Sequence, residues 1–315
     1  MQLERPNLDE FGDTLLALGQ QNRDLLVVTS DSRGSGKLVP FGQILPEQIV
    51  EVGIAEQNVV GVAAGLASAG KTVFAVSPAC FLTTRALEQI KNDVAYSDFP
   101  VKLIGISAGV SYGALGTTHH SLHDYAALRA INNIDIVAPA DNLETRDAIK
   151  AALAHPRPLY IRFGKKPMYQ LHRPDTQFEI GKAITLTSGS DVTFIATGEP
   201  VAPAFMAAQL LADEGISCRV ISMHTVKPLD EETLLRAAAE TKAIITVEEH
   251  SIFGGLGSAC AEILMQKGIC LPFKIVGIPD EDTVTGSQSE IFEHYGISPQ
   301  GLAQTARRLL RAGDN

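Results

Sequence analysis

The sequence is short of basic residues. It has 26 lysines and arginines against 36 aspartates and glutamates, which gives a formal net charge of −10. No run of lysine or arginine is longer than two residues. Nucleic acids and anionic membranes are bound by basic patches, so neither is expected as the main partner.

Cysteine is also scarce. The four cysteines are Cys80, Cys218, Cys260 and Cys270, and none forms a C-x-x-C pair. Three of them lie in apolar segments, which is typical of buried thiols in a reducing compartment. We therefore expect free thiols and no disulfide framework.

Long apolar runs are missing as well. The longest, from Val59 to Gly70, has about a dozen residues and is rich in glycine and alanine, whereas a membrane-spanning helix needs about 20. The first ten residues, MQLERPNLDE, are polar and acidic, unlike a secretory signal. These absences predict a cytoplasmic protein, and 315 residues are enough for two domains.

Short apolar runs rich in β-branched residues recur along the chain, each followed by a loop and a helical stretch. The runs are nearly continuous rather than alternating, which is typical of strands buried on both faces of a parallel sheet. They span 25–31, 49–54, 72–77, 101–107, 134–139 and 158–163, then 191–197, 217–223, 243–249 and 273–279. The sequence predicts an α/β fold with two domains, each a mostly parallel sheet covered by helices on both faces.

A segment of different composition separates the two series of strands. The segment 167–190 contains two prolines and scattered polar residues without a long period. We interpret it as a linker with one short strand. This places a first domain at 1–166 and a second at 191–315.

The stretch EVGIAEQNVVGVAAGLASAG, residues 51–70, puts a carboxylate at the joint between a strand and a helix of small residues. Glu56 is expected to be buried there, and a buried carboxylate needs a partner or must take up a proton. In parallel α/β sheets, ligands bind beyond the C-terminal ends of the strands. Asp31, Ser77, Ser107 and the loop with His119 are expected at the same edge, which predicts a site there.

The loop GVSYGALGTTHHSLHD, residues 109–124, holds three histidines within five residues. His119 and His123 have the spacing of helical zinc ligands, but no H-E-x-x-H pattern or Cys/His cluster accompanies them, so a metal is disfavoured. The glycines are not followed by Lys-Ser or Lys-Thr, which excludes a P-loop. For His120 and His123 a helix-capping role is as plausible as a functional one, whereas His119 is favoured as a catalytic or substrate-binding residue.

Two further segments have a structural and a functional interpretation. EEHSIFGGLGSACAEI, residues 248–263, reads as a strand, a glycine turn and a helix start, which can bind an anion. It lacks the full dinucleotide fingerprint, so a tight structural turn is favoured. Phe81 lies near the start of a helical stretch at 77–97, where a lone phenylalanine usually belongs to the core.

Together these segments resemble the C-terminal portion of the transketolase family of thiamine-diphosphate enzymes. VGIAEQN is similar to the family's acidic motif, and TTHHS with LRAINNIDIVAPADNLET resembles its histidine loop and the strand that follows. HTVKPLDEETL, VEEH and GGLGSACAE are similar to its third domain. The resemblance runs from about residue 7 to residue 310, with the motifs in the family's order.

The family's G-D-G…N motif, which holds the cofactor diphosphate through a divalent metal, is missing. The chain therefore resembles the second half of a split transketolase, with the pyrimidine-binding and C-terminal domains. The resemblance implies thiamine diphosphate and Mg²⁺, with the metal ligands on a separate N-terminal-half subunit. It also implies an α2β2 assembly that acts on sugar phosphates by transferring a two-carbon ketol unit to an aldose.

The resemblance assigns three residues to the cofactor. Glu56 is implied to hydrogen-bond N1′ of the aminopyrimidine ring and so to stabilise the imino tautomer that deprotonates thiazolium C2. Asp31 is implied to lie near the cofactor, and Phe81 near the aromatic wall against the pyrimidine. A proton shared with a ring nitrogen would satisfy a buried acid.

The resemblance assigns three residues to the substrate. His119 is implied to contact the reacting oxygens of the sugar, and Arg162 and Ser35 its phosphate. Two departures concern specificity: Leu115 stands where many members have an aspartate that reads an acceptor hydroxyl, and Ser107 replaces a phosphate-binding histidine. Leucine cannot accept a hydrogen bond, so an unusual or narrower set of sugars is expected.

Other readings remain open. The β subunit of a 2-oxo-acid dehydrogenase has a related layout, but the APADNLET segment and the GALGTTHH loop favour transketolase. A deoxyxylulose-phosphate synthase is normally one long chain. A non-catalytic paralogue could keep the fold, although the retained Glu56, His119 and Arg162 argue against it.

Overall fold

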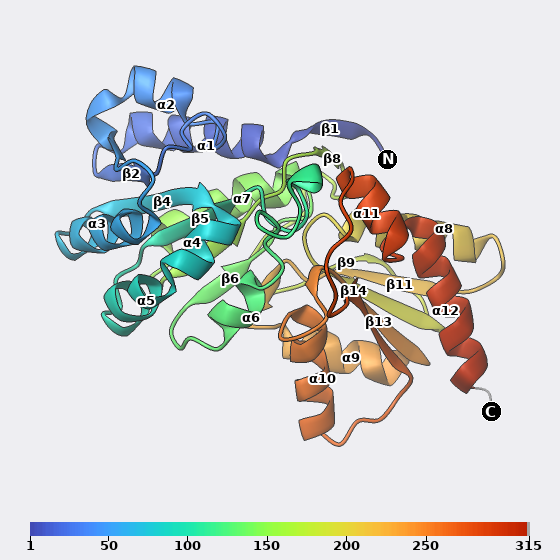
Figure 1. Cartoon of the computed structure of the whole chain (residues 1–315). Coiled ribbons are helices and arrows are strands. Elements are labelled where there is room, and N and C mark those ends of the chain that lie inside the picture. The colour runs from blue at the N-terminus through green and yellow to red at the C-terminus, as the bar shows by residue number, and fades with distance from the viewer. Residues whose placement is uncertain (314–315) are drawn as a thin grey trace.

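The computed structural model describes residues 1–313. It shows two α/β domains side by side, the first coloured blue to green and the second mainly yellow to red (Figure 1). A strand forms within each of the ten predicted segments, and the strands lie in sheets flanked by helices. The predicted fold class is therefore confirmed.

The first domain is built on a seven-stranded sheet of order β12-β6-β7-β5-β4-β2-β3. All neighbours pair in parallel except β12, which is antiparallel to β6. The strands are β2 (Leu25–Thr29), β3 (Ile49–Glu51), β4 (Thr72–Pro78), β5 (Lys102–Ile106), β6 (Asp135–Val137), β7 (Leu159–Arg162) and β12 (Thr225–Lys227). The edge strand β12 is contributed by the second half of the chain, which the sequence did not predict.

Helices cover both faces of this sheet. One face packs against α1 (Asn7–Gln21), α2 (Val39–Ile44) and α7 (Asn142–Ala154). The other packs against α3 (Glu56–Ser68), α4 (Ala79–Arg85), α5 (Leu87–Gln89), the π-helical turn η2 (Ile90–Tyr96) and α6 (Asp124–Arg129). The helical stretch expected at 77–97 is thus broken into three short pieces, and its first piece carries Phe81.

The second domain has a five-stranded sheet of order β14-β13-β10-β11-β9, parallel except for β9. Its strands are β9 (Ile184–Thr187), β10 (Val192–Ala196), β11 (Cys218–Ser222), β13 (Ala243–Ser251) and β14 (Phe273–Ile278). One face packs against α8 (Val201–Ala212) and α12 (Pro299–Gly313), and the other against α9 (Glu231–Glu240) and α10 (Leu256–Gln266). The short helix α11 (Gln288–His294) precedes α12.

The segment expected as a linker is tied to both domains. Its first strand, β8 (Pro167–Tyr169), pairs antiparallel with β1 (Leu3–Pro6). Its second, β9, joins the sheet of the second domain. The sequence predicted one strand here and the structure has two, because short strands with intermediate burial carry a weak hydrophobic pattern.

Aspartates placed just before two helices explain where those helices begin. The side chain of Asp141 accepts a hydrogen bond from the backbone N–H of Glu144 at 2.9 Å, which caps α7. Asp230 accepts one from Thr233 at 3.0 Å and caps α9. Such caps satisfy backbone donors that a helix cannot satisfy itself.

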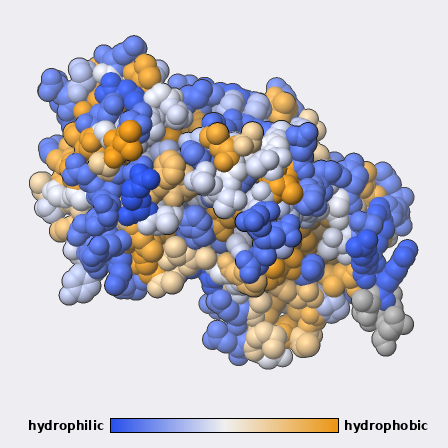
Figure 2. Space-filling view, viewed as in Figure 1, coloured by the Kyte–Doolittle hydropathy of each residue, from blue (hydrophilic) through white to orange (hydrophobic). Residues whose placement is uncertain are grey.

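The face shown in Figure 2 is mainly hydrophilic, with hydrophobic residues in separate patches. Within residues 1–313, no helix is both long and apolar enough to cross a membrane. Cys80, Cys218 and Cys260 are buried free thiols, whereas Cys270 is exposed. Burial raises the pKa of Cys80 to about 11 and that of Cys218 to about 12, so these thiols are poor nucleophiles at neutral pH.

Candidate functional site

Glu56 is the first residue of α3, just beyond the end of β3, and only 2% of it is exposed. The N-terminus of a helix favours a negative charge. The guanidinium of Arg85 donates a hydrogen bond to Glu56 through Nη1 and Oε2, 2.5 Å apart. The buried acid in the structure therefore has a cationic partner.

Arg85 was not identified from the sequence as a candidate site residue. It is the last residue of α4, one helical turn after Phe81, and its guanidinium carbon lies 4.9 Å from the centroid of the Phe81 ring. Side chains four residues apart share a helix face, so the spacing from Phe81 was a signal that could have pointed to Arg85. Phe81 is not a core residue: its ring is half-buried and carries the guanidinium.

The histidine loop reaches the same place. The ring of His119 lies edge-on to Phe81, with centroids 5.4 Å apart, and edge-on to Tyr112 at 5.3 Å. Thr118 Oγ1 is 2.9 Å from His119 Nδ1. A cavity of about 410 Å³ adjoins this contact, with Phe81 and Arg85 in its wall. Glu56, Arg85, Phe81 and His119 are therefore joined by consecutive contacts.

The other two histidines of the loop line this cavity, and each has a partner within the chain. His120 is buried, its Nε2 lies 2.9 Å from the carbonyl oxygen of Gly113, and burial lowers its pKa. His123 stands at the N-cap position of α6 but makes no capping bond, and its Nε2 is 2.5 Å from Thr84 Oγ1. The capping role is thus wrong for both side chains. Among residues 1–313, no group of three or more His, Cys, Asp or Glu residues could hold a metal ion.

Asp31 and Ser35 lie in the turn after β2 and are both exposed. Burial raises the pKa of the Tyr112 hydroxyl, and the charge of Asp31 is a smaller cause of this rise. Ser35 has no described contact with the Glu56–His119 series. Leu115 is 56% exposed in the loop, and Ser107 adopts a left-handed φ of 54° at the end of β5.

Arg162 differs from its expected role. It is 6% exposed, and its Nη1 lies 2.9 Å from Asp124 Oδ1 while its Nη2 lies 2.9 Å from the carbonyl oxygen of Glu249. It also stacks on Tyr125, 4.5 Å from the ring centroid. The guanidinium is engaged within the protein between the two domains, an arrangement that favours a structural role over a phosphate contact.

Lys165, three residues after Arg162, is a cation with better access to solvent. Lys165 is exposed, and its ammonium lies 4.6 Å from the centroid of Tyr112. Because Tyr112 contacts His119, Lys165 stands beside the histidine loop. Attraction between an ammonium and an aromatic face leaves the charge available to an anion.

A hydrogen-bond network holds the histidine loop against the second domain. Glu249 accepts the backbone N–H of Val110 at 2.9 Å. The amide of Gln288 donates to Glu249 at 2.7 Å and to Glu199 at 2.6 Å. Burial, and next the charge of Glu249, raise the pKa of Glu199 to about 8, so one of these carboxyls is largely protonated at neutral pH.

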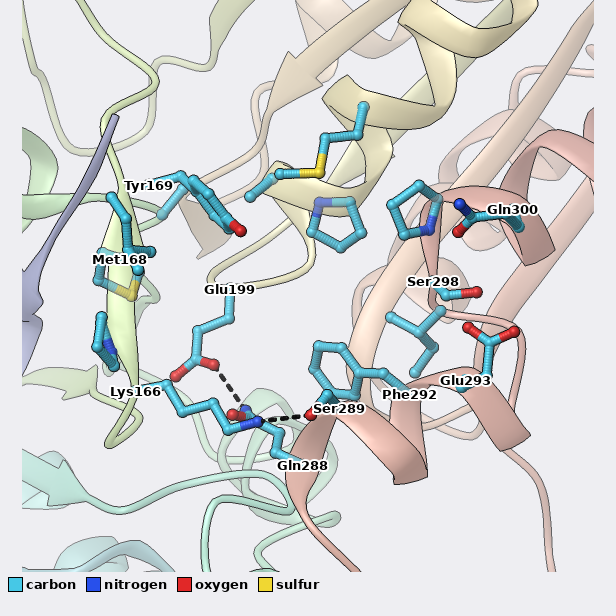
Figure 3. A pocket seen from close by; sticks show the side chains of 18 residues that line it. Lys166, Met168, Tyr169, Glu199, Gln288, Ser289, Phe292, Glu293, Ser298 and Gln300 are labelled. Carbon is cyan, nitrogen blue, oxygen red and sulfur yellow. Dashed lines mark hydrogen bonds between the residues drawn. The ribbon is translucent and has the colours of Figure 1, made fainter. Parts of the chain in front are cut away.

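A cavity of about 440 Å³ opens on the outer side of this network, between β8, α8 and α11. Figure 3 shows Glu199 and Gln288 at its floor, with Lys166 hydrogen-bonded to Ser289 at 3.1 Å nearby. Its walls are largely apolar, with Met168 and Phe292 among them. The network therefore lies between this interdomain cavity and the histidine loop.

The glycine turn at 248–263 is structural, as favoured from the sequence. Glu248 accepts the backbone N–H groups of Leu256 at 2.7 Å and Gly257 at 2.8 Å, at the start of α10. A Cβ on Gly255 would lie 1.9 Å from Glu248 Oε2. The protein's own carboxylate fills the place where an external anion would bind.

Comparisons with known proteins agree with this architecture. Residues 8–170 match the model of the transketolase pyrimidine binding domain, and residues 181–302 match that of the transketolase C-terminal domain. The chain is 48% identical over 302 residues to one of the subunits of an apulose-4-phosphate transketolase of Phocaeicola vulgatus, covering 96% of each. It is 36% identical over 302 residues to the 6-deoxy-6-sulfo-D-fructose transketolase subunit SqwH of Clostridium sp. (strain MSTE9), covering 96% of this chain and 93% of that one.

A solved structure described as "Split gene transketolase, inactive beta4 tetramer" superposes with a TM-score of 0.87 at 36% identity. The superposition covers 98% of this chain and 99% of that one. Both halves of the chain thus match one family over nearly their whole length, in sequence and in fold. The chain belongs to the transketolase family of transferases.

Proposed function

We propose that this chain is the pyrimidine-binding subunit of a two-subunit, thiamine-diphosphate-dependent transketolase. It would transfer a two-carbon ketol unit from a ketose phosphate to an aldose. The observation that carries the proposal is the series of contacts from Glu56 through Arg85 and Phe81 to His119. These contacts bring a buried acid, an aromatic face and a histidine together beside a cavity whose wall includes Phe81 and Arg85.

The residues present fit an aminopyrimidine ring. Such a ring needs an acid for its nitrogen and an apolar face for its plane, which Glu56 and Phe81 offer next to a cavity of about 410 Å³. The sequence has no G-D-G motif for a diphosphate and metal. We therefore place the Mg²⁺ ligands and the diphosphate site on the partner subunit.

Bound thiamine diphosphate supplies a nucleophilic carbon and an electron sink for cleavage of the bond between C2 and C3 of the ketose. Glu56 would share a proton with the ring nitrogen and so set the tautomer of the ring. His119, half-buried between Phe81 and Tyr112, would hydrogen-bond the reacting oxygens of the sugar. Lys165 would attract the substrate phosphate, since Arg162 is engaged by Asp124.

The surface around Glu56 suits a second chain. Ile54, two residues before Glu56, is 75% exposed. A Cβ added at Gly61 or Gly65 of α3 would meet no heavy atom of the described residues within 4 Å, so another helix could approach closely. Two relatives are named as transketolase subunits, and the similar split-gene structure is an inactive β4 tetramer. We propose that activity requires the N-terminal-half subunit, in an α2β2 assembly.

The two relatives named as subunits carry the names of different substrates, apulose 4-phosphate and 6-deoxy-6-sulfo-D-fructose. Leu115 is exposed in the histidine loop and cannot accept a hydrogen bond from an acceptor hydroxyl. We therefore propose an unusual or narrow set of ketoses and aldoses. A donor and acceptor screen that matched ordinary transketolase selectivity would contradict this.

Native mass spectrometry on the chain, gently purified from its host, tests the assembly. We expect equal numbers of a second chain, together with the mass of thiamine diphosphate and a divalent ion. The same complex, assayed for ketol transfer, should lose turnover by about 10²–10⁴-fold in Glu56→Gln, the usual contribution of general acid–base catalysis. Glu47→Gln, an exposed carboxylate near β3, is the matched control and should remain active. An active Glu56→Gln complex would refute the role of Glu56.

The activity assay and native mass spectrometry together separate the alternatives. Decarboxylation of a 2-oxo acid with transfer to a lipoyl group would identify the β subunit of a 2-oxo-acid dehydrogenase. A homodimer without companion or cofactor would favour a non-catalytic paralogue. The match of both halves of the chain to transketolase models supports ketol transfer over both.

A further inference from the structure

The ion pair between Glu56 and Arg85 occupies the place that the cofactor ring is proposed to take. We propose that Arg85 is a displaceable counter-ion, which pairs with Glu56 in the cofactor-free chain and must leave the carboxylate before the pyrimidine can bind. The displacement rests on the proposed function, whereas the stabilisation of Glu56 by Arg85 stands on the structure alone.

Arg85 and the ring compete for the same carboxyl group. Arg85 Nη1 lies 2.5 Å from Glu56 Oε2 and donates a hydrogen bond to it. The ring nitrogen is proposed to share a proton with this carboxyl group, and only 2% of Glu56 is exposed, so there is little room for both partners. Arg85 therefore holds the group that the ring would have to bind.

Arg85 is the member of the pair that can move. Glu56 is 2% exposed and begins a helix, whereas the side chain of Arg85 is 47% exposed. Arg85 ends α4, and the chain turns at Ala86 before α5 starts. Its guanidinium rests on the face of Phe81, which is also the face offered to the ring. Ring binding would thus remove both contacts of the guanidinium and turn it toward solvent.

A merely structural ion pair makes a different prediction from a displaceable one. In both cases, loss of Arg85 leaves a buried carboxylate without its partner and destabilises the free chain. Only a displaceable counter-ion makes the same substitution favourable for cofactor binding, because the competing partner is gone. Opposite signs for stability and for affinity are therefore the signature of the proposal.

The first experiment uses the chain alone and measures its thermal midpoint. Arg85→Met should lower the midpoint by several degrees, and Glu56→Gln should remove most of that loss when combined with it, because a neutral amide needs no counter-ion. Arg33→Met is the matched control, since Arg33 is partly exposed and pairs with the surface residue Glu51 at 3.3 Å. An unchanged midpoint in Arg85→Met, or a double variant as unstable as Arg85→Met, would overturn the counter-ion role.

The second experiment uses the complex with the partner subunit and titrates thiamine diphosphate by calorimetry. If about one free chain in ten has Glu56 unpaired, Arg85→Met should bind about tenfold more tightly than the wild type. Equal or weaker binding would overturn the displacement while the proposed function stands. A wild-type complex that binds no thiamine diphosphate would overturn both, and the measurement on the chain alone would still report on the pair.

Discussion

Replacement of Arg162 by methionine distinguishes a structural arginine from a phosphate-binding one. The guanidinium is buried and hydrogen-bonded to Asp124 at 2.9 and 3.2 Å and to the carbonyl of Glu249 at 2.9 Å. Removing one partner from a buried pair leaves a buried charge without compensation and costs about 3–5 kcal/mol. We expect Arg162→Met to lose that much free energy of unfolding, a fall in the thermal midpoint on the order of 10 °C.

The assay is denaturant unfolding of the chain, followed by circular dichroism. Arg146→Met, on the exposed side of α7, is the control and should change stability by less than about 0.5 kcal/mol. Arg162→Met combined with Asp124→Leu should be less unstable than the sum of the single changes, because the two residues are coupled. If Arg162→Met is as stable as the wild type and the complex shows only a raised KM for phosphorylated sugars, our reasoning about Arg162 is wrong.

Two further predictions concern the network that holds the histidine loop. Gly109 has a φ of 60°, and a Cβ there would lie 2.1 Å from Glu249 Cδ. Gly109→Ala should therefore destabilise the chain by about 1–3 kcal/mol. Gly65→Ala is the control: Gly65 faces open space on α3, so this change should leave the unassembled chain equally or more stable. Unfolding experiments on both variants check this, and a neutral Gly109→Ala would contradict it. The raised pKa of Glu199 means that its contribution to stability is complete below its ordinary pKa of 4.5 and is lost as the pH rises through about 8. Thermal midpoints should therefore fall between pH 6 and pH 8, and Glu199→Gln should flatten that slope; an equal slope in the variant would exclude Glu199 as a source.

The strands could be predicted because burial on both faces leaves an unmistakable pattern. LLVVT in β2 and KLIGI in β5 are such continuous runs. The three-residue strand β12 could not be found this way. Its pairing with β6 joins Thr225 to Val137, far apart in the chain, and three residues are too few to show a period.

In the candidate site, too, some residues could be predicted from the sequence and others could not. Glu56 and His119 stand out in the sequence because their residue types are unusual for their surroundings, and the structure connects them through Phe81. Arg162 also follows a strand, but the sequence does not reveal that Asp124 and Glu249 meet its guanidinium. Arg85 was overlooked because its role depends on its hydrogen bond to Glu56, which lies 29 positions earlier in the chain.

The antiparallel strand β12 bears on whether the two domains can be separated. An open sheet edge presents unpaired backbone groups that can recruit strands from other chains. Here the second domain covers the edge of the first sheet at β6, and Lys227 of β12 donates a hydrogen bond to the carbonyl oxygen of Arg129. The two family models, at 8–170 and 181–302, therefore mark shared ancestry rather than separable parts, because the strand that closes the first sheet lies within the second model.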